Sequence, residues 1–168
     1  MMTIEKEHID EKLFRILETV PDPEIPVLSI MEMGIVRSAI LNENNIVEVK
    51  ITPTYSGCPA MDVIGDDIKK ALKDAGYESI IKLVLSPAWS TDWITSKGRL
   101  ALEKYGIASP LEPEADKEAL LGNKKLVKCP QCGSLNTKLV SQFGSTACKA
   151  FFQCEDCLEP FDYFKCLK

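Results

Sequence analysis

The sequence predicts an α+β fold, with a small, mostly antiparallel sheet and helices on one side of it, followed by a zinc ribbon. In the first part of the chain, helix-like and strand-like patterns follow the order helix, hairpin, helix, strand, helix, which is typical of α+β domains. In the last part, six of the seven cysteines lie after residue 128. We therefore divide the chain into an α+β domain (1–107), a linker (108–125) and a cysteine-rich domain (126–168).

The composition is that of an ordinary globular protein, with 45% hydrophobic and 27% charged residues. A formal net charge of −5 argues against general nucleic-acid binding, because a basic surface supplies most of that affinity. The sequence has no apolar run long enough to span a membrane and no signal-peptide pattern at 1–7, so we expect a cytoplasmic protein. In a reducing cytoplasm, seven cysteines indicate metal ligands and reactive thiols rather than disulfides.

The first predicted elements are a helix and a hairpin joined by an acidic turn. Apolar residues recur at helical spacing from Ile9 to Val20, and the helix should end before Pro21, because a residue preceding proline avoids the α region. The rigid turn 21–26 carries Asp22 and Glu24. Two strands, 35–41 and 46–51, then form a hairpin around an asparagine-rich turn.

The segment that follows the hairpin carries Cys58. Apolar residues at helical spacing predict a helix that ends near Gly76, and Pro59 suits its first position, which places Cys58 at the N-cap. The helix dipole and the unpaired backbone N–H groups there stabilise a thiolate, so Cys58 is a candidate reactive thiol. The alternative is a small buried residue that fills a tight turn.

A third strand (80–85) and a last helix (92–105) complete the predicted α+β domain. Trp89 and Trp93 flank the start of that helix; such aromatics are usually half-buried core, whereas an exposed pair would indicate a docking surface. The polar, proline-containing segment 108–125, with at most one helical turn near 119–121, indicates a linker. The single histidine, His8, has no partner pattern.

The cysteine-rich domain contains two CxxC pairs separated by 21 residues, and they are Cys129, Cys132, Cys154 and Cys157. Each pair suits a tight turn on which two thiolates converge on one ion, and Gly133 permits the positive φ of such a turn. Strand-like runs at 137–143 and 149–153 complete the pattern of a zinc ribbon. So short a domain buries too little apolar surface to fold alone, so the metal, zinc or iron, supplies the folding free energy.

Four further candidate site residues each allow two interpretations. Cys148 and Cys166 either pack beneath the ribbon or add thiolates near the first site, as ligands of a transient iron–sulfur cluster. Asp22 and Glu24 are either solvated turn acids or, if their loop folds over the helix end at Cys58, carboxylates that help to hold a metal ion.

Several motifs resemble those of the iron–sulfur assembly domain family of SufT-type factors, namely 22–26 (DPEIP), 33–36 (MGIV), 52–59 (TPTYSGCP) and 87–93 (PAWSTDW). Two C-terminal motifs, 144–150 (GSTACKA) and 161–166 (FDYFKC), resemble the D-subunit family of the phenylacetyl-CoA epoxidase system. That family combines the assembly domain with a cysteine-rich tail. The resemblance implies that Cys58 is the reactive residue, and that the protein helps to assemble or insert metal centres in partners rather than catalysing the oxygenation.

The favoured hypothesis is an accessory maturation factor without catalytic turnover of its own. Cys58 would bind or relay iron or a cluster, aided by Asp22 and Glu24, while the ribbon recruits the client. The expected partners are oxygenase or reductase subunits of the phenylacetyl-CoA epoxidase system or other iron–sulfur assembly proteins. The sequence is also compatible with a homo-oligomer and does not determine the oligomeric state. The alternative is a thiol-dependent enzyme with Cys58 as nucleophile or redox thiol. A nucleic-acid-binding ribbon is disfavoured, since 126–168 holds five lysines against four acidic residues.

Overall fold

The computed structural model describes residues 9–167, so His8 and the N-terminal segment lie outside the described residues. The chain forms two compact units. The first unit extends to Trp89 and includes Trp93–Thr95; the second comprises Ser90–Asp92 and the chain from Ser96 onward. No helix in the described part of the chain is both long enough and apolar enough to cross a membrane.

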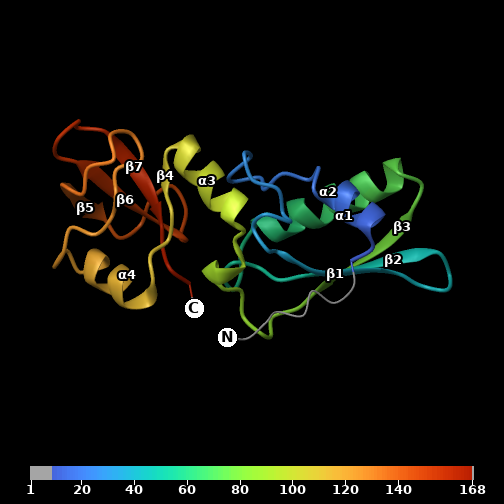
Figure 1. Ribbon diagram of the computed structural model, residues 1–168. Helices are drawn as coiled ribbons and strands as arrows, with labels where there is room; N and C mark the ends of the chain where they lie inside the picture. The colour runs from blue at the N-terminus through green and yellow to red at the C-terminus, as the bar shows by residue number, and fades with distance from the viewer. Residues whose placement is uncertain (1–8, 168) are drawn as a thin grey trace. The chain divides into compact units, whose positions relative to one another are not determined.

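The first unit is built on a three-stranded sheet in the order β1-β2-β3, formed by β1 (Val36–Leu41), β2 (Ile46–Ile51) and β3 (Glu78–Leu83) (Figure 1). The predicted hairpin is confirmed, since β1 and β2 pair antiparallel. β2 and β3, however, pair in parallel, so the sheet is mixed rather than mostly antiparallel. The reason is the crossover helix α2 (Ala60–Asp74) between them, which returns the chain in its original direction.

Helices α1 (Glu11–Leu17) and α2 lie on the same side of this sheet (Figure 1), as the sequence predicts. Asp10 caps α1, because its side chain accepts a hydrogen bond from the Lys12 N–H. The core between sheet and helices consists of alternate β2 residues and one face of α2, all at most 2% exposed: Val47, Val49, Ile51, Ile64, Ile68 and Leu72. The period of two in β2 and the helical period in α2 therefore meet in one apolar layer.

The two tryptophans belong to the packing of the first unit. Trp89 is buried, and its indole N–H donates to the Met33 carbonyl at 2.9 Å. Trp93 is half-buried, and the Arg37 guanidinium lies 3.8 Å from its ring centroid. Gly34 has a φ of +69°, and a Cβ there would lie 2.6 Å from both the Cβ and the carbonyl oxygen of Trp93. The pair is core rather than an exposed docking surface.

The second unit holds a four-stranded sheet in the order β4-β7-β6-β5 (Figure 1). Its strands are β4 (Ile107–Ala108), β5 (Thr137–Ser141), β6 (Lys149–Cys154) and β7 (Pro160–Phe164). β5, β6 and β7 pair antiparallel, as in a ribbon, whereas β4 joins β7 in parallel. The aromatic run at 161–164 thus forms an inner strand of the sheet, on which Phe152 of β6 contacts Phe161 and Tyr163.

The structure corrects the predicted linker at 108–125. Ala108 lies in β4, and α4 (Pro113–Leu120) follows with a proline in its first turn. Ala119 and Val127 belong to the apolar core of the second unit. The sequence conceals this helix because the buried face of α4 consists of one alanine and one aspartate, which show no apolar periodicity.

Asp116 is that aspartate, and it joins α4 to the last strand. Its Oδ1 accepts the Tyr163 hydroxyl at 2.5 Å and the Cys166 N–H at 2.9 Å. The same Tyr163 oxygen accepts the Leu111 N–H at 3.1 Å. The predicted last helix is likewise divided: a 3-10 turn covers Thr91–Trp93, and α3 (Ser96–Tyr105) groups with the second unit. The predicted boundary near residue 107 therefore falls inside the second unit.

Candidate metal centre and cysteine sites

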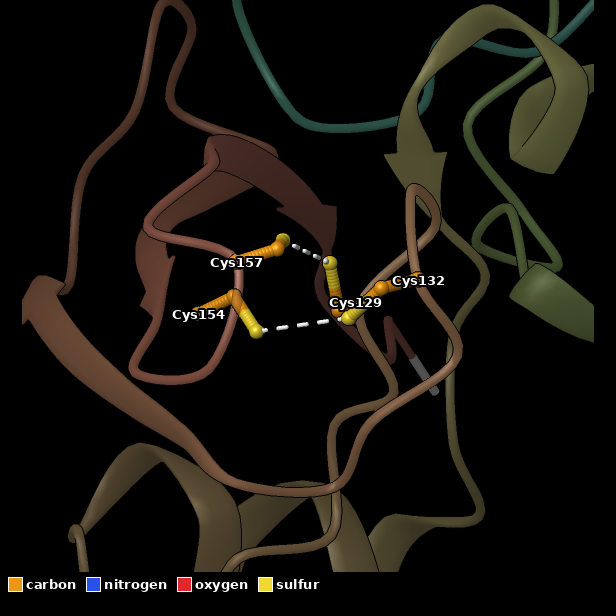
Figure 2. Close-up of side chains that lie close together, drawn as sticks. All are labelled: Cys129, Cys132, Cys154 and Cys157. Atoms are coloured by element: carbon orange, nitrogen blue, oxygen red, sulfur yellow. Dashed lines mark hydrogen bonds between the residues drawn. The ribbon is translucent and has the colours of Figure 1, made fainter.

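The four CxxC cysteines converge on one point (Figure 2). All four Sγ atoms lie within 4.8 Å of one another. The Sγ atoms of Cys129 and Cys157 are 3.8 Å apart, and those of Cys132 and Cys154 are 3.6 Å apart. Four sulfurs placed at ~2.3 Å from a tetrahedral zinc ion would be separated by about 3.8 Å. The donor set and its spacing therefore fit one tetrahedral ion.

Each cysteine pair is held on a tight turn by backbone hydrogen bonds. In the first turn, the Gly133 N–H donates to the Cys129 carbonyl at 2.9 Å, and Gly133 has the positive φ, +79°, that the sequence predicts. The second turn joins β6 to β7, and the Cys154 N–H donates to the Glu159 carbonyl at 2.9 Å. Cys129 and Cys154 are buried, whereas Cys132 and Cys157 are exposed.

A polar network connects the two turns, and no pattern in the sequence predicts it. The Asp156 carboxylate accepts the Ser134 hydroxyl at 2.5 Å and the Asn136 side-chain amide at 2.7 Å. These two hydrogen bonds lower the pKa of Asp156. The Glu155 N–H also donates to the Asn136 carbonyl at 2.8 Å. Residues of the first turn therefore fix the position of the second.

The thiols of the group differ in acidity. The N–H groups of Cys157 and Asp156 donate to the Cys154 sulfur and lower its pKa to about 7. The Glu159 N–H favours the Cys157 thiolate, but partial loss of hydration at the sulfur and the three neighbouring thiols outweigh it and raise the Cys157 pKa to about 12. Four thiolates in this space repel one another, so the group needs a cation to ionise fully.

Cys148 and Cys166 do not join this centre. Cys148 precedes β6 and Cys154 ends it, a separation of six strand residues or about 20 Å. Cys166 follows β7, whose last residue, Phe164, pairs with Lys149 at the start of β6. Both thiols therefore lie at the opposite end of the sheet, where Cys148 is 4% exposed. Their ligation of a transient cluster stays a prediction, separate from the ribbon centre.

Cys58 lies in the connection between β2 and α2. The helix begins at Ala60 with Pro59 as its N-cap, so Cys58 precedes the cap rather than occupying it. The shift arises because Pro59 already has helical angles, φ −69° and ψ −18°. The Cys58 N–H donates to the Tyr55 carbonyl, and its own carbonyl accepts the Met61 N–H, both at 3.3 Å. The side chain is half-buried, next to the positive-φ residue Gly57.

Asp22 and Glu24 lie in the loop that follows α1. Asp22 is 6% exposed, and its Oδ1 accepts the N–H groups of Glu24 and Ile25, both at 2.8 Å. The Asp22 N–H donates to the Leu28 carbonyl at 2.8 Å. Asp22 is therefore no solvated turn acid, because one of its oxygens organises the backbone of its own loop. Glu24 is half-buried.

The sequence reasoning missed Glu32, which is 8% exposed. Its carboxylate accepts the Ser29 N–H at 3.0 Å, and its own N–H donates to the Ser29 hydroxyl at 3.1 Å. This reciprocal pair is a capping box, and the spacing of Ser29 and Glu32 is its sequence signature. That signal could have identified the turn before β1.

Two family models match the chain in its two parts. Residues 10–78 match the iron-sulfur cluster assembly protein family, and residues 113–165 match the PaaD zinc beta ribbon domain. Over 165 residues the chain is 42% identical to an Escherichia coli protein named as the D subunit of 1,2-phenylacetyl-CoA epoxidase, covering 93% of this chain and 92% of the relative. The chain belongs to the family of this epoxidase D subunit. The match to the zinc-ribbon family starts at residue 113, where α4 begins, and the structure likewise groups α4 with the second unit.

The first part of this member of the D-subunit family is also similar to smaller proteins. The Bacillus subtilis Fe-S protein maturation auxiliary factor YitW is 31% identical over 99 residues, covering 58% of this chain and 96% of the relative. A crystal structure of the domain of unknown function DUF59 from Bacillus anthracis is 33% identical, with a TM-score of 0.51. That match covers 54% of this chain and 88% of the solved chain. The assembly domain thus exists without the ribbon in other proteins.

Proposed function

We propose that this protein is an accessory maturation factor for a multicomponent phenylacetyl-CoA oxygenase, and that it helps to assemble or insert iron or iron–sulfur centres in the subunits of that enzyme. The observation that carries the proposal is the pair of matches in one chain: an iron–sulfur assembly domain and the ribbon of the epoxidase D-subunit family. The 42% identity to a relative named as an epoxidase subunit supports the choice of client. The name of the Bacillus subtilis relative supports a maturation role.

In this proposal Cys58 binds or relays the cargo. Thiolate is a ligand that iron and iron–sulfur clusters accept, and Cys58 lies half-buried in a connecting loop. Among residues 9–167, the ribbon cysteines form the only cluster of three or more candidate metal ligands, so Cys58 offers an incomplete site. An incomplete site suits transfer, because the receiving protein can supply the remaining ligands. Asp22 would shape its own acidic loop, and Glu24 of that loop would supply a carboxylate.

The ribbon has a different part in the proposal. Four cysteines fill a tetrahedral site and leave no open position for a substrate, which is the pattern of a structural zinc ion rather than a catalytic one. We therefore assign Zn²⁺ to Cys129, Cys132, Cys154 and Cys157. Its role would be to fold the second unit, which then recruits an oxygenase or reductase subunit.

The test is complementation in cells that produce the oxygenase subunits. We expect that cells lacking this protein, or carrying Cys58→Ser, yield client subunits with reduced iron and sulfide content and reduced activity. Client that already holds its metal should work without this protein. Full metal content with Cys58→Ser would contradict the relay role. An oxygenase that needs this chain stoichiometrically in every turnover would instead indicate a structural or catalytic subunit.

A second measurement separates a relay from a thiol-dependent enzyme. Iodoacetamide should alkylate Cys58 in the purified protein, and Fe²⁺ added anaerobically should slow that reaction if the thiolate binds iron. The variant Cys58→Ser is the matched control, because it keeps the other six cysteines. Alkylation at the same rate with and without iron would favour a nucleophilic or redox thiol.

A further inference from the structure

The sheet of the first unit has an open edge at β3. Among the described residues, no strand pairs with the side of β3 that faces away from β2. In the register of the two strands, Ile51 lies beside Leu83, yet Ile51 is 2% exposed and Leu83 is 55% exposed. The apolar face of the sheet therefore continues from β2 onto β3. The residues that bury this face at Ile51 do not extend over Leu83.

A groove of about 400 Å³ lies between α2 and β3. Its apolar lining comes from the ends of β2 and β3 and the first turn of α2, namely Ile51, Ile81, Leu83 and Met61. Its charged lining comes from α2 and consists of Asp62, Asp66 and Lys69. The Lys69 ammonium lies 3.9 Å from the Asp66 carboxylate. The charged lining therefore holds two carboxylates against one ammonium group, and the groove keeps a negative charge.

We propose that this β3 groove binds an extended segment of a partner protein that carries a lysine or arginine among apolar residues. The segment would add to β3 as a strand, because an edge strand offers unpaired backbone N–H and C=O groups. Every second side chain of an added strand points to the same face of the sheet as Ile81 and Leu83. On that face, apolar side chains would cover Leu83, and a cation would lie between Asp62 and Asp66.

The charge of the groove favours a different protein over a second copy of this chain. The β3 residues that share the face of the core are Ser79, Ile81 and Leu83, which include no cation. Lys82 points to the opposite face and forms an ion pair with Glu48 at 2.7 Å. A second β3 strand would therefore leave Asp62 and Asp66 without a new counterion.

The groove begins at Met61, three residues after Cys58, so a bound segment would lie beside the Cys58 loop. The open edge of β3 and the apolar and charged linings of the groove are the same whether Cys58 carries iron, a cluster or neither. A test of the proposal can therefore use purified protein without any cargo.

The test is a titration of the ¹⁵N-labelled full chain with the blocked peptide Thr-Val-Thr-Lys-Thr-Val-Thr, followed by amide chemical shifts. We expect saturable shifts in β3 and in the first turn of α2. Exchanging the peptide lysine for glutamate should weaken binding by up to about fivefold, the upper end of the scale of exposed ion pairs. The double variant Asp62→Asn, Asp66→Asn should weaken it similarly. Asp74→Asn, on the same helix outside the groove, should leave the affinity within about twofold.

Three results would overturn the proposal. The first is an absence of shifts in β3 at millimolar peptide, and the second is equal affinity for the lysine and glutamate peptides. The third is a concentration-dependent dimer in analytical ultracentrifugation that Leu83→Lys abolishes, because the occupant of the edge would then be a second copy of this chain.

Discussion

The ribbon cysteines and Cys58 present the same thiol group in opposite surroundings. The ribbon cysteines converge within 4.8 Å, on two turns that backbone hydrogen bonds and the Asp156 network hold in place. Cys58 stands in the single loop between β2 and α2, where its backbone makes hydrogen bonds with Tyr55 and Met61. The ribbon holds four thiols that converge on one point, whereas the loop offers a single thiol.

The two units also differ in what their cysteines do for folding. The core of the first unit consists mainly of aliphatic residues, together with Met33 and Trp89, and Cys58 is not part of it. The core of the second unit includes two of the four proposed zinc ligands, Cys129 and Cys154, beside Phe152 and Tyr163. A ligand loss should therefore damage the second unit far more than a change at Cys58 damages the first.

The largest expected effect follows from Cys154→Ser. It removes a buried ligand at the end of β6, and metal binding supplies folding free energy on the order of 10 kcal/mol in small structural zinc domains. We expect bound metal to fall from one ion per chain to nearly none, and residues 113–165 to become sensitive to protease. Metal analysis and limited proteolysis with mass spectrometry measure both effects.

Cys148→Ser is the matched control for this prediction. Cys148 is also a buried cysteine of the second unit, but it lies at the end of the sheet away from the ribbon centre. The variant should keep its metal and its protease resistance. Loss of metal from Cys148→Ser, or a Cys154→Ser variant that stays folded without metal, would remove the distinction between the two sites.

The next largest effect is expected in the first unit, at Gly34 rather than at Cys58. An alanine there combines a left-handed φ with a Cβ placed 2.6 Å from the backbone and side chain of Trp93. Strain and overpacking together should lower the free energy of unfolding by about 2–4 kcal/mol in urea denaturation. Gly76→Ala is the control, because φ is +90° but no atom lies within 4 Å of the new Cβ. Equal losses in both variants would show that the contact with Trp93 carries no energy.

A smaller effect is expected from Tyr163→Phe, which removes the anchor between α4 and β7. The variant leaves the buried Asp116 carboxylate and the Leu111 N–H without this partner, a cost of about 1–3 kcal/mol. Thermal denaturation of the metal-loaded protein measures it. A variant as stable as the parent would show that Asp116 finds another donor.

The same tyrosine predicts a pH dependence. Burial and the hydrogen bond to Asp116 raise the pKa of Tyr163 above its ordinary value. The unfolded state, with a tyrosine pKa of about 10, then releases a proton that the folded state keeps, so stability should fall as pH rises above about 10. Tyr163→Phe should show a shallower fall over that range. Identical slopes in the two proteins would contradict the role of this hydroxyl.

Much of the fold could be predicted because its patterns are local. The alternation over Ile46–Ile51 and the helical period after Pro59 each define one element, and both are in the structure. The parallel pairing of β3 could not be predicted in the same way, since it depends on where the chain returns after α2. The α4 helix was hidden because its contact with the core uses Asp116 and Ala119, residues without an apolar signature.

The candidate sites show the same limit. The spacing of the CxxC pairs identified four residues that the structure does bring together, because a metal site built from two short turns is local in sequence. The contribution of Asn136 and Asp156 required the register of β5 and β6, which spacing does not contain. The role of Asp22 in its loop was also hidden, since a buried carboxylate that accepts backbone N–H groups looks like a turn acid in sequence.

The smallest effect on stability is expected from Cys58→Ser, and it completes the contrast with Cys154. The hydrogen bonds with Tyr55 and Met61 involve the Cys58 backbone, so replacing Sγ with a hydroxyl leaves both intact. The free energy of unfolding should change by no more than about 0.5 kcal/mol, and the ribbon should keep one ion per chain. Urea denaturation and metal analysis measure the two quantities. A loss comparable with that of Cys154→Ser, or release of the ribbon metal, would mean that Cys58 supports the fold. With stability unchanged, a defect in client metal content can be attributed to the missing thiolate, since only the chemistry of the loop has been altered.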